Sequence, residues 1–185
     1  MEQSSRGRDA LERGEAARRG GQPALARTAF GEALALFRRE GDLSGAARAL
    51  GRQAQIARDA GDLDWALHVQ VEAIALHRRA GDGPGLAHAL RHAGEMFLEQ
   101  DRLANAAACL HEALDLYRAD PETPPLAMAN MLRGVALLAT ALGEREAART
   151  YWIDARGLYA ALGPLFPGGN TGVAEADRQL AALAG

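Results

Sequence analysis

Two histidines and a carboxylate share one short stretch near the middle of the chain. His88 and His92 stand four residues apart, and Glu95 follows three residues later. On a helix this spacing brings all three side chains to one face. Two such imidazoles can bind a metal ion, with the carboxylate as a third ligand. Metal binding is only a remote alternative, because such spacings often arise by chance and the H-E-x-x-H signature is absent.

The chain carries no recognisable catalytic motif. Its serines are Ser4, Ser5 and Ser44, and none of them lies in a G-x-S-x-G turn. The glycines between Gly163 and Gly172 are not followed by Lys-Ser or Lys-Thr, as a phosphate-binding loop requires. We therefore expect a protein that is not an enzyme and that has no cofactor and no metal site.

Composition points to a helical, globular chain. Of its 185 residues 48% are hydrophobic and 24% charged, values typical of a single globular domain. Alanine, the best helix former, makes up about a fifth of the residues. The net charge is −3, which argues against a nucleic-acid partner.

Cysteine usage and hydropathy suggest a cytoplasmic protein. Cys109 is the only cysteine, so an internal disulfide is excluded and a reducing compartment is expected. The first residues are polar, and the sequence has no run of about 18 apolar residues. We expect neither a membrane anchor nor a membrane partner.

The elements that must position the histidines repeat along the chain. Four similar segments begin at Ala33, Ala73, Ala113 and Ala155, which are 40, 40 and 42 residues apart. A second alanine lies seven residues before each of them. Self-similarity at a fixed period of this size is the signature of stacked repeats.

Each repeat is predicted to form two helices joined by a tight turn that contains glycine or aspartate. The predicted helices cover about 5–19, 23–40, 43–60, 63–80, 84–100, 103–119, 125–142, 145–162 and 172–184. The segment from Gly163 to Gly172 is predicted to be a loop. The last helix follows no repeat, and we expect it to cap the stack.

Further positions recur in phase with the alanines. The first helix of each repeat carries a small residue, and the turn follows seven residues later. The small residues are Gly14, Ala54, Gly94 and Ala136, and the turn residues are Gly21, Gly61, Asp101 and Gly143. Together these residues resemble the tetratricopeptide repeat (TPR) family, in the longer form found in kinesin light chain-like and bacterial regulatory proteins.

The resemblance implies an all-α, right-handed superhelix of four helix pairs with a C-terminal capping helix. The whole chain, 1–185, would be one TPR-like domain. Its repeats would cover about 5–41, 42–81, 82–123 and 124–162, and the capping helix about 172–184.

In this family the first helices of successive repeats line a concave groove that binds peptides. The resemblance places ten polar residues in that groove: Arg48, Arg52, Gln55, Arg58, His88, Arg91, His92, Glu95, Asn130 and Arg133. We hypothesise that Arg48, Arg91 and Arg133 form a ladder for an acidic peptide or a free C-terminal carboxylate, because guanidinium groups match carboxylates bidentately. The alternative is that these arginines pair with neighbouring acids such as Glu95.

Two residues of the second repeat depart from the pattern. Gln70 is polar where the other repeats have Phe30, Leu110 and Trp152, and His77 replaces an aromatic ring. We expect His77 to be a packed ring with one hydrogen bond, for which Gln70 is the predicted partner.

The resemblance thus implies a protein-interaction scaffold that binds a peptide or a partner protein, for example in bacterial signalling or regulation. One alternative is a structural protein that self-assembles as a homodimer or by end-to-end stacking. A small-molecule or metal binder is the remote alternative.

Overall fold

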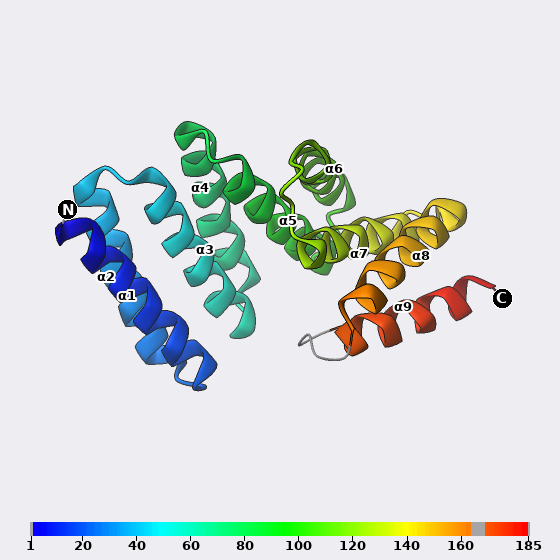
Figure 1. The fold of residues 1–185 in the computed structure, drawn as a ribbon, viewed down its shortest axis with the longest axis horizontal. Helices are drawn as coiled ribbons and strands as arrows, with labels where there is room; N and C mark the ends of the chain where they lie inside the picture. Colours follow the sequence, from blue (N-terminus) through cyan, green and yellow to red (C-terminus); the bar gives the residue numbers. More distant parts are fainter. Residues whose placement is uncertain (1, 164–168, 185) are drawn as a thin grey trace. The chain divides into compact units, whose positions relative to one another are not determined.

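The computed structural model describes residues 2–163 and 169–184, and within these ranges nine α-helices pack as sequential pairs (Figure 1). The helices are α1 (Glu2–Arg19), α2 (Pro23–Glu40), α3 (Leu43–Asp59), α4 (Leu63–Ala80), α5 (Gly83–Glu99), α6 (Leu103–Ala119), α7 (Pro125–Ala141), α8 (Arg145–Leu162) and α9 (Gly169–Ala184). The predicted all-α class and helix pairing are therefore confirmed. No helix within the described ranges has the length and apolar character needed to cross a lipid bilayer.

The chain divides into two compact units at the boundary between Met96 and Phe97. Unit 1 contains α1 to α4 and most of α5, and unit 2 contains the end of α5 and α6 to α9. In unit 1 a cluster of apolar side chains around Phe37, Leu50 and Val69 forms the core. In unit 2 Trp152 is fully buried in a second cluster.

The recurring alanines lie where helices touch. The eight alanines of the second helices have no exposed surface: Ala26, Ala33, Ala66, Ala73, Ala106, Ala113, Ala148 and Ala155. A methyl side chain lets two helix backbones approach closely and does not weaken either helix. The alanine pattern in the sequence thus marks the positions at which the helices are most tightly packed.

A ring near the end of a second helix packs against a glycine of the helix that follows. The pairs are Phe37 with Gly45, His77 with Gly85 and Tyr159 with Gly172. A Cβ atom built on any of these glycines would overlap the ring. These ring–glycine contacts therefore depend on the missing side chain, which allows the ring to lie on the helix backbone.

The turns use the residues that the sequence predicted. Asp42, Asp62 and Asp82 each accept a hydrogen bond from the backbone N–H three residues later, at 2.7, 3.1 and 2.9 Å. This satisfies a donor at the start of the helix that has no partner within the helix. Asp101 occupies a turn where the other repeats have glycine, and its φ of 55° is the one positive value at a non-glycine residue in the described part of the chain.

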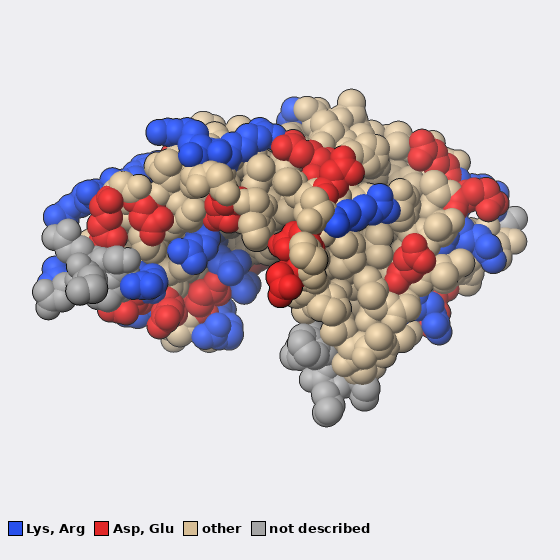
Figure 2. Space-filling view, turned by 45° about the horizontal axis from the view of Figure 1, so that its top comes forward, with Lys and Arg blue, Asp and Glu red and all other residues tan. Residues whose placement is uncertain are grey.

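Arginines lie at the C-terminal ends of α2 and α4. Arg38 and Arg39 lie in the last turn of α2, and Arg78 and Arg79 lie in the last turn of α4. Figure 2 shows basic side chains as a band along the upper edge of unit 1. Cations at these positions interact favourably with the carbonyl ends of the helix dipoles. We refer to Arg38, Arg39, Arg78 and Arg79 as the basic rim.

The start of the last helix differs from the prediction. The predicted loop from Gly163 to Gly172 is wrong in its last part, because α9 already begins at Gly169. Residues 164–168 lie outside the described residues. Gly172 lies within α9, where a Cβ atom would overlap the ring of Tyr159, so this glycine allows close packing and does not form a turn.

Candidate binding site

Unit 1 contains a cavity of about 220 Å³ with walls from α1, α3, α4 and α5. Alanine, glycine and Leu11 supply its apolar surface. Its polar lining residues are two arginines, two glutamines and three histidines: Arg48, Arg52, Gln55, Gln70, His77, His88 and His92. No aspartate or glutamate belongs to the described lining. The charged groups of the lining are therefore the two guanidinium groups, of which that of Arg52 is paired with Glu15.

The structure brings together most of the residues predicted for the groove. Arg48, Arg52, Gln55, His88 and His92 line the cavity. The predicted residues Arg58, Arg91 and Glu95 form a cluster with His92 in unit 1, described below. Asn130 and Arg133 belong to unit 2.

The two arginines of the cavity differ in how they are held. Arg52 forms an ion pair through its Nε atom with Glu15 of α1, and its Nη1 atom donates to Oε1 of Gln55 at 3.1 Å. Arg48 is exposed and has no hydrogen bond or ion pair to any described residue. Its guanidinium group is thus free to bind a ligand, whereas that of Arg52 is already oriented.

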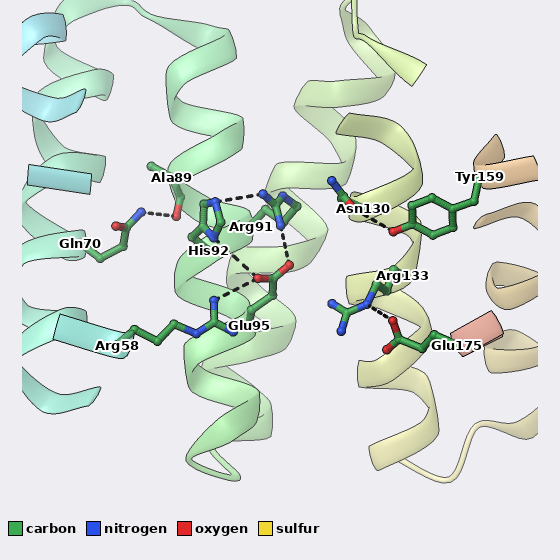
Figure 3. A network of polar contacts seen from close by, with 10 residues as sticks. All are labelled: Arg58, Gln70, Ala89, Arg91, His92, Glu95, Asn130, Arg133, Tyr159 and Glu175. Carbon is green, nitrogen blue, oxygen red and sulfur yellow. Dashed lines mark hydrogen bonds and ion pairs between the residues drawn. The ribbon is translucent and has the colours of Figure 1, made fainter. Parts of the chain in front are cut away.

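Glu95 is the centre of a buried charged cluster (Figure 3). Its two oxygens accept hydrogen bonds from Nη1 of Arg91 at 2.5 Å and from Nη1 of Arg58 at 3.3 Å. Arg91 and Glu95 are 7% and 8% exposed. Burial acts to raise the pKa of Glu95, but the contact with His92 and the charges of the arginines outweigh it and hold the pKa well below its usual range. Glu95 is therefore ionised.

The contacts of His92 define its tautomer. Its Nε2 atom lies 3.0 Å from Nη2 of Arg91. An arginine can only donate, so Nε2 accepts and the proton sits on Nδ1, which faces Oε2 of Glu95 at 3.6 Å. Burial and then the charge of Arg91 lower the pKa of His92.

His88 packs edge-to-face on His92, with ring centroids 4.5 Å apart. Desolvation and then the charges of His92 and Arg91 lower the pKa of His88 as well, although its side chain is exposed. Both rings are neutral near pH 7. Within the described residues no group of three or more His, Cys, Asp or Glu side chains is arranged to hold a metal ion.

The two residues that depart from the repeat pattern lie in the cavity wall. Gln70 is 2% exposed, and its Nε2 atom donates to the backbone oxygen of Ala89 at 2.8 Å, which ties α4 to α5 (Figure 3). Nδ1 of His77 donates to Oδ2 of Asp82 at 2.9 Å. The predicted bond from His77 to Gln70 is therefore wrong, because the aspartate that caps α5 lies against the ring. Desolvation lowers the pKa of His77 and outweighs the opposing effect of Asp82.

In unit 2 the predicted groove residues have partners within the unit. Nε of Arg133 forms an ion pair with Oε2 of Glu175 at 2.8 Å, and the hydroxyl of Tyr159 donates to Oδ1 of Asn130 at 2.7 Å (Figure 3). These contacts join α7 to α9 and to α8. Of the three arginines of the predicted ladder, Arg91 and Arg133 thus bind acids of the chain, and Arg48 does not.

No family model matches the chain, and no curated protein matches it in sequence. Solved structures do match its fold. BtubC (BKLC) from P. vanneervenii is 16% identical with a TM-score of 0.73, and the match covers 85% of this chain and 65% of BtubC. The chain thus spans just under two thirds of the length of BtubC.

The nearly identical TPR-like repeats from Podosopora anserina, described as those of a kinesin light chain, are 14% identical in each of two crystal structures. The TM-scores are 0.72 and 0.73, and in both cases the match covers 99% of this chain and 87% of the other. Identities this low establish the fold and nothing finer. The chain is a TPR-like repeat protein, structurally similar to BtubC and to kinesin light chain-like TPR repeats.

Proposed function

We propose that the chain is a non-catalytic protein-interaction module, and that the cavity of unit 1 receives an acidic side chain or a free C-terminal carboxylate of a partner protein. The observation that carries this proposal is the polar lining of the cavity, which includes two arginines and no carboxylate. Stacked helix pairs commonly present extended surfaces to protein partners, and this supports a peptide as the ligand.

The size of the cavity favours part of a peptide over a complete small molecule. Its volume of about 220 Å³ is below the range of roughly 300–1,000 Å³ that is common for small-molecule sites. One carboxylate-bearing side chain or chain end fits such a space, while the rest of the peptide lies outside it.

The polar groups of the cavity have complementary tasks. Arg48 offers planar paired donors to a carboxylate. Arg52, whose charge Glu15 balances, adds a guanidinium group that Glu15 and Gln55 hold in place. Neutral His88 and the amide of Gln55 each offer a donor and an acceptor, which suits the backbone of an extended peptide.

The proposal is tested by fluorescence anisotropy with labelled peptides that are acidic or neutral and otherwise matched. Acidic peptides should bind more tightly, and Arg48→Ala should weaken their binding about tenfold or more, because a hydrogen bond to a charged group contributes roughly 1.5–3 kcal/mol. Arg39→Ala is the matched control, since Arg39 is an exposed arginine on the basic rim and does not line the cavity. Equal binding of both peptides, or equal losses in both variants, would contradict the proposal.

A further inference from the structure

Two large apolar side chains are exposed at the edge of unit 1 where its helix pairs turn. Leu25 near the start of α2 is 59% exposed, and Trp65 near the start of α4 is 52% exposed. They occupy equivalent positions 40 residues apart. In Figure 1 the α1–α2 and α3–α4 turns lie at the same end of the unit. We refer to these two turns and the first residues of α2 and α4 as the turn edge.

Each of these side chains borders its own hollow. Leu25 lines one of about 600 Å³ between α1 and α2, and Trp65 lines one of about 380 Å³ between α2, α3 and α4. The indole ring of Trp65 stacks on His68, with ring centroids 5.3 Å apart. A large exposed aromatic ring beside a hollow is a typical anchor of a protein contact.

The two turns carry opposite charges. Arg18 and Arg19 end α1, and Arg27 follows on the first turns of α2. Asp59 ends α3, and Asp62 and Asp64 begin α4. Arg19, Arg27 and Asp59 are exposed and form no ion pair with any described residue. The basic patch of the α1–α2 turn and the acidic patch of the α3–α4 turn adjoin at the hollow of Trp65, which both Arg27 and Asp62 line.

This arrangement is complementary to itself. In a two-fold dimer each contact occurs twice, because residue i of one copy meets residue j of the other and the reverse. A two-fold axis between the turns sets the basic patch of each copy against the acidic patch of the other, and Leu25 against Trp65 of the second copy. A partner of one charge sign would be repelled by one of the patches. We propose that the occupant of the turn edge is a second copy of this chain.

Charge reversal tests the pairing of the patches by sedimentation velocity of the full chain, at concentrations up to about 100 µM. The wild type should form dimers that dissociate on dilution. Asp59→Arg should raise the dissociation constant about tenfold or more, and so should Arg19→Asp combined with Arg27→Glu. Asp59→Arg should not disturb the fold, because an arginine is favourable at the end of α3. All three changes together should regain part of the lost affinity, because residues 19 and 27 are then acidic and residue 59 is basic, so that these positions attract one another again across the two-fold axis.

Two substitutions on one helix test the apolar contact. Trp65→Ala should weaken the dimer about tenfold or more. Val71→Ala should leave it unchanged, because Val71 is 53% exposed on the same helix but lines neither hollow. Circular dichroism of each variant confirms folding. The variant Trp152→Phe leaves Trp65 as the one tryptophan of the chain. In this variant, association should shift the fluorescence emission of Trp65 to shorter wavelength.

Three results would overturn the proposal. The first is a wild type that stays monomeric up to about 100 µM. The second is a dimer that Trp65→Ala and Val71→Ala weaken equally. The third is a folded triple variant that binds itself no more tightly than the variants with only one patch changed. None of these results bears on peptide binding in the cavity, so the two proposals fail independently.

Discussion

At the scale of single residues, what distinguishes the arginines of this chain is whether a carboxylate already binds them. Arg91 and Glu95 are both buried and bind each other, whereas Arg48 is exposed and has no such partner. A buried ion pair adds little stability over an apolar pair of the same size, but the loss of one member leaves a charge without compensation. Arg91 and Glu95 therefore belong to the framework of unit 1, and Arg48 is available to a ligand.

Replacement of Glu95 tests this division. Glu95→Gln removes the charge that balances Arg91 and Arg58, so the free energy of unfolding should fall by about 3 kcal/mol. Urea denaturation measures it. Glu32→Gln is the control, because Glu32 forms an exposed ion pair with Arg13 and should contribute less than about 1 kcal/mol. Equal losses in the two variants would show that the Glu95 cluster is not a buried framework.

The lowered pKa of His77 predicts how the stability of the fold depends on pH. The pKa of His77 is lower in the folded chain than its ordinary value of 6.5. Below about pH 6.5 the unfolded chain therefore binds more protons at this position, and stability falls as the pH decreases toward the folded pKa. His77→Phe should make the fall in unfolding free energy between about pH 7.5 and 5 less steep. The same slope in His77→Phe and in the wild type would refute the assignment.

At the scale of elements, the approach of α5 to α4 depends on one glycine. A Cβ on Gly85 would overlap the ring of His77, whereas a Cβ on Gly83 would meet no atom within 4 Å. Gly85→Ala should reduce the free energy of unfolding by about 1–3 kcal/mol through overpacking. Gly83→Ala, two residues earlier in the same helix, should be neutral or stabilising, because alanine favours the helix. Thermal denaturation of both variants measures the two effects. If Gly85→Ala does not reduce the free energy of unfolding, the ring of His77 can move aside.

The helices could be predicted from the sequence more fully than the contacts between them. Alanine spacing and turn residues located the helix pairs, because each repeat must bury the same face. The partners of His77 and Arg133 were not predictable in this way. Asp82 is a turn residue whose carboxylate contacts both Gly85 and His77, and Glu175 lies on α9, which follows no repeat. The helix is three residues longer at its start than the predicted 172–184, and the packing role of Gly172 was not predictable, because a glycine in sequence does not reveal whether it serves a turn or a close approach.

At the scale of the whole molecule, each unit contains one of the two tryptophans, and α5 contributes residues to both units. In a linear array of repeats, stability depends on each repeat and on its contacts with its neighbours. Loss of either unit frees one end of α5, so we expect the units to unfold together. Variants Trp65→Phe and Trp152→Phe each leave one reporter. In each variant the urea midpoints from fluorescence and circular dichroism should coincide; separate midpoints would show independent unfolding.

The ring–glycine contacts are alike at the junctions after the first and after the second repeat. His77 meets Gly85 as Phe37 meets Gly45, and in both cases a capping aspartate stands three residues before the glycine. If residues 42–81 were duplicated in tandem, the first His77 would meet the second Gly45 and could still bond to the second Asp42. At the new junction the duplicated chain would therefore keep the ring–glycine contact and the aspartate beside it. The length of the array is thus open to change by gene duplication in steps of one repeat.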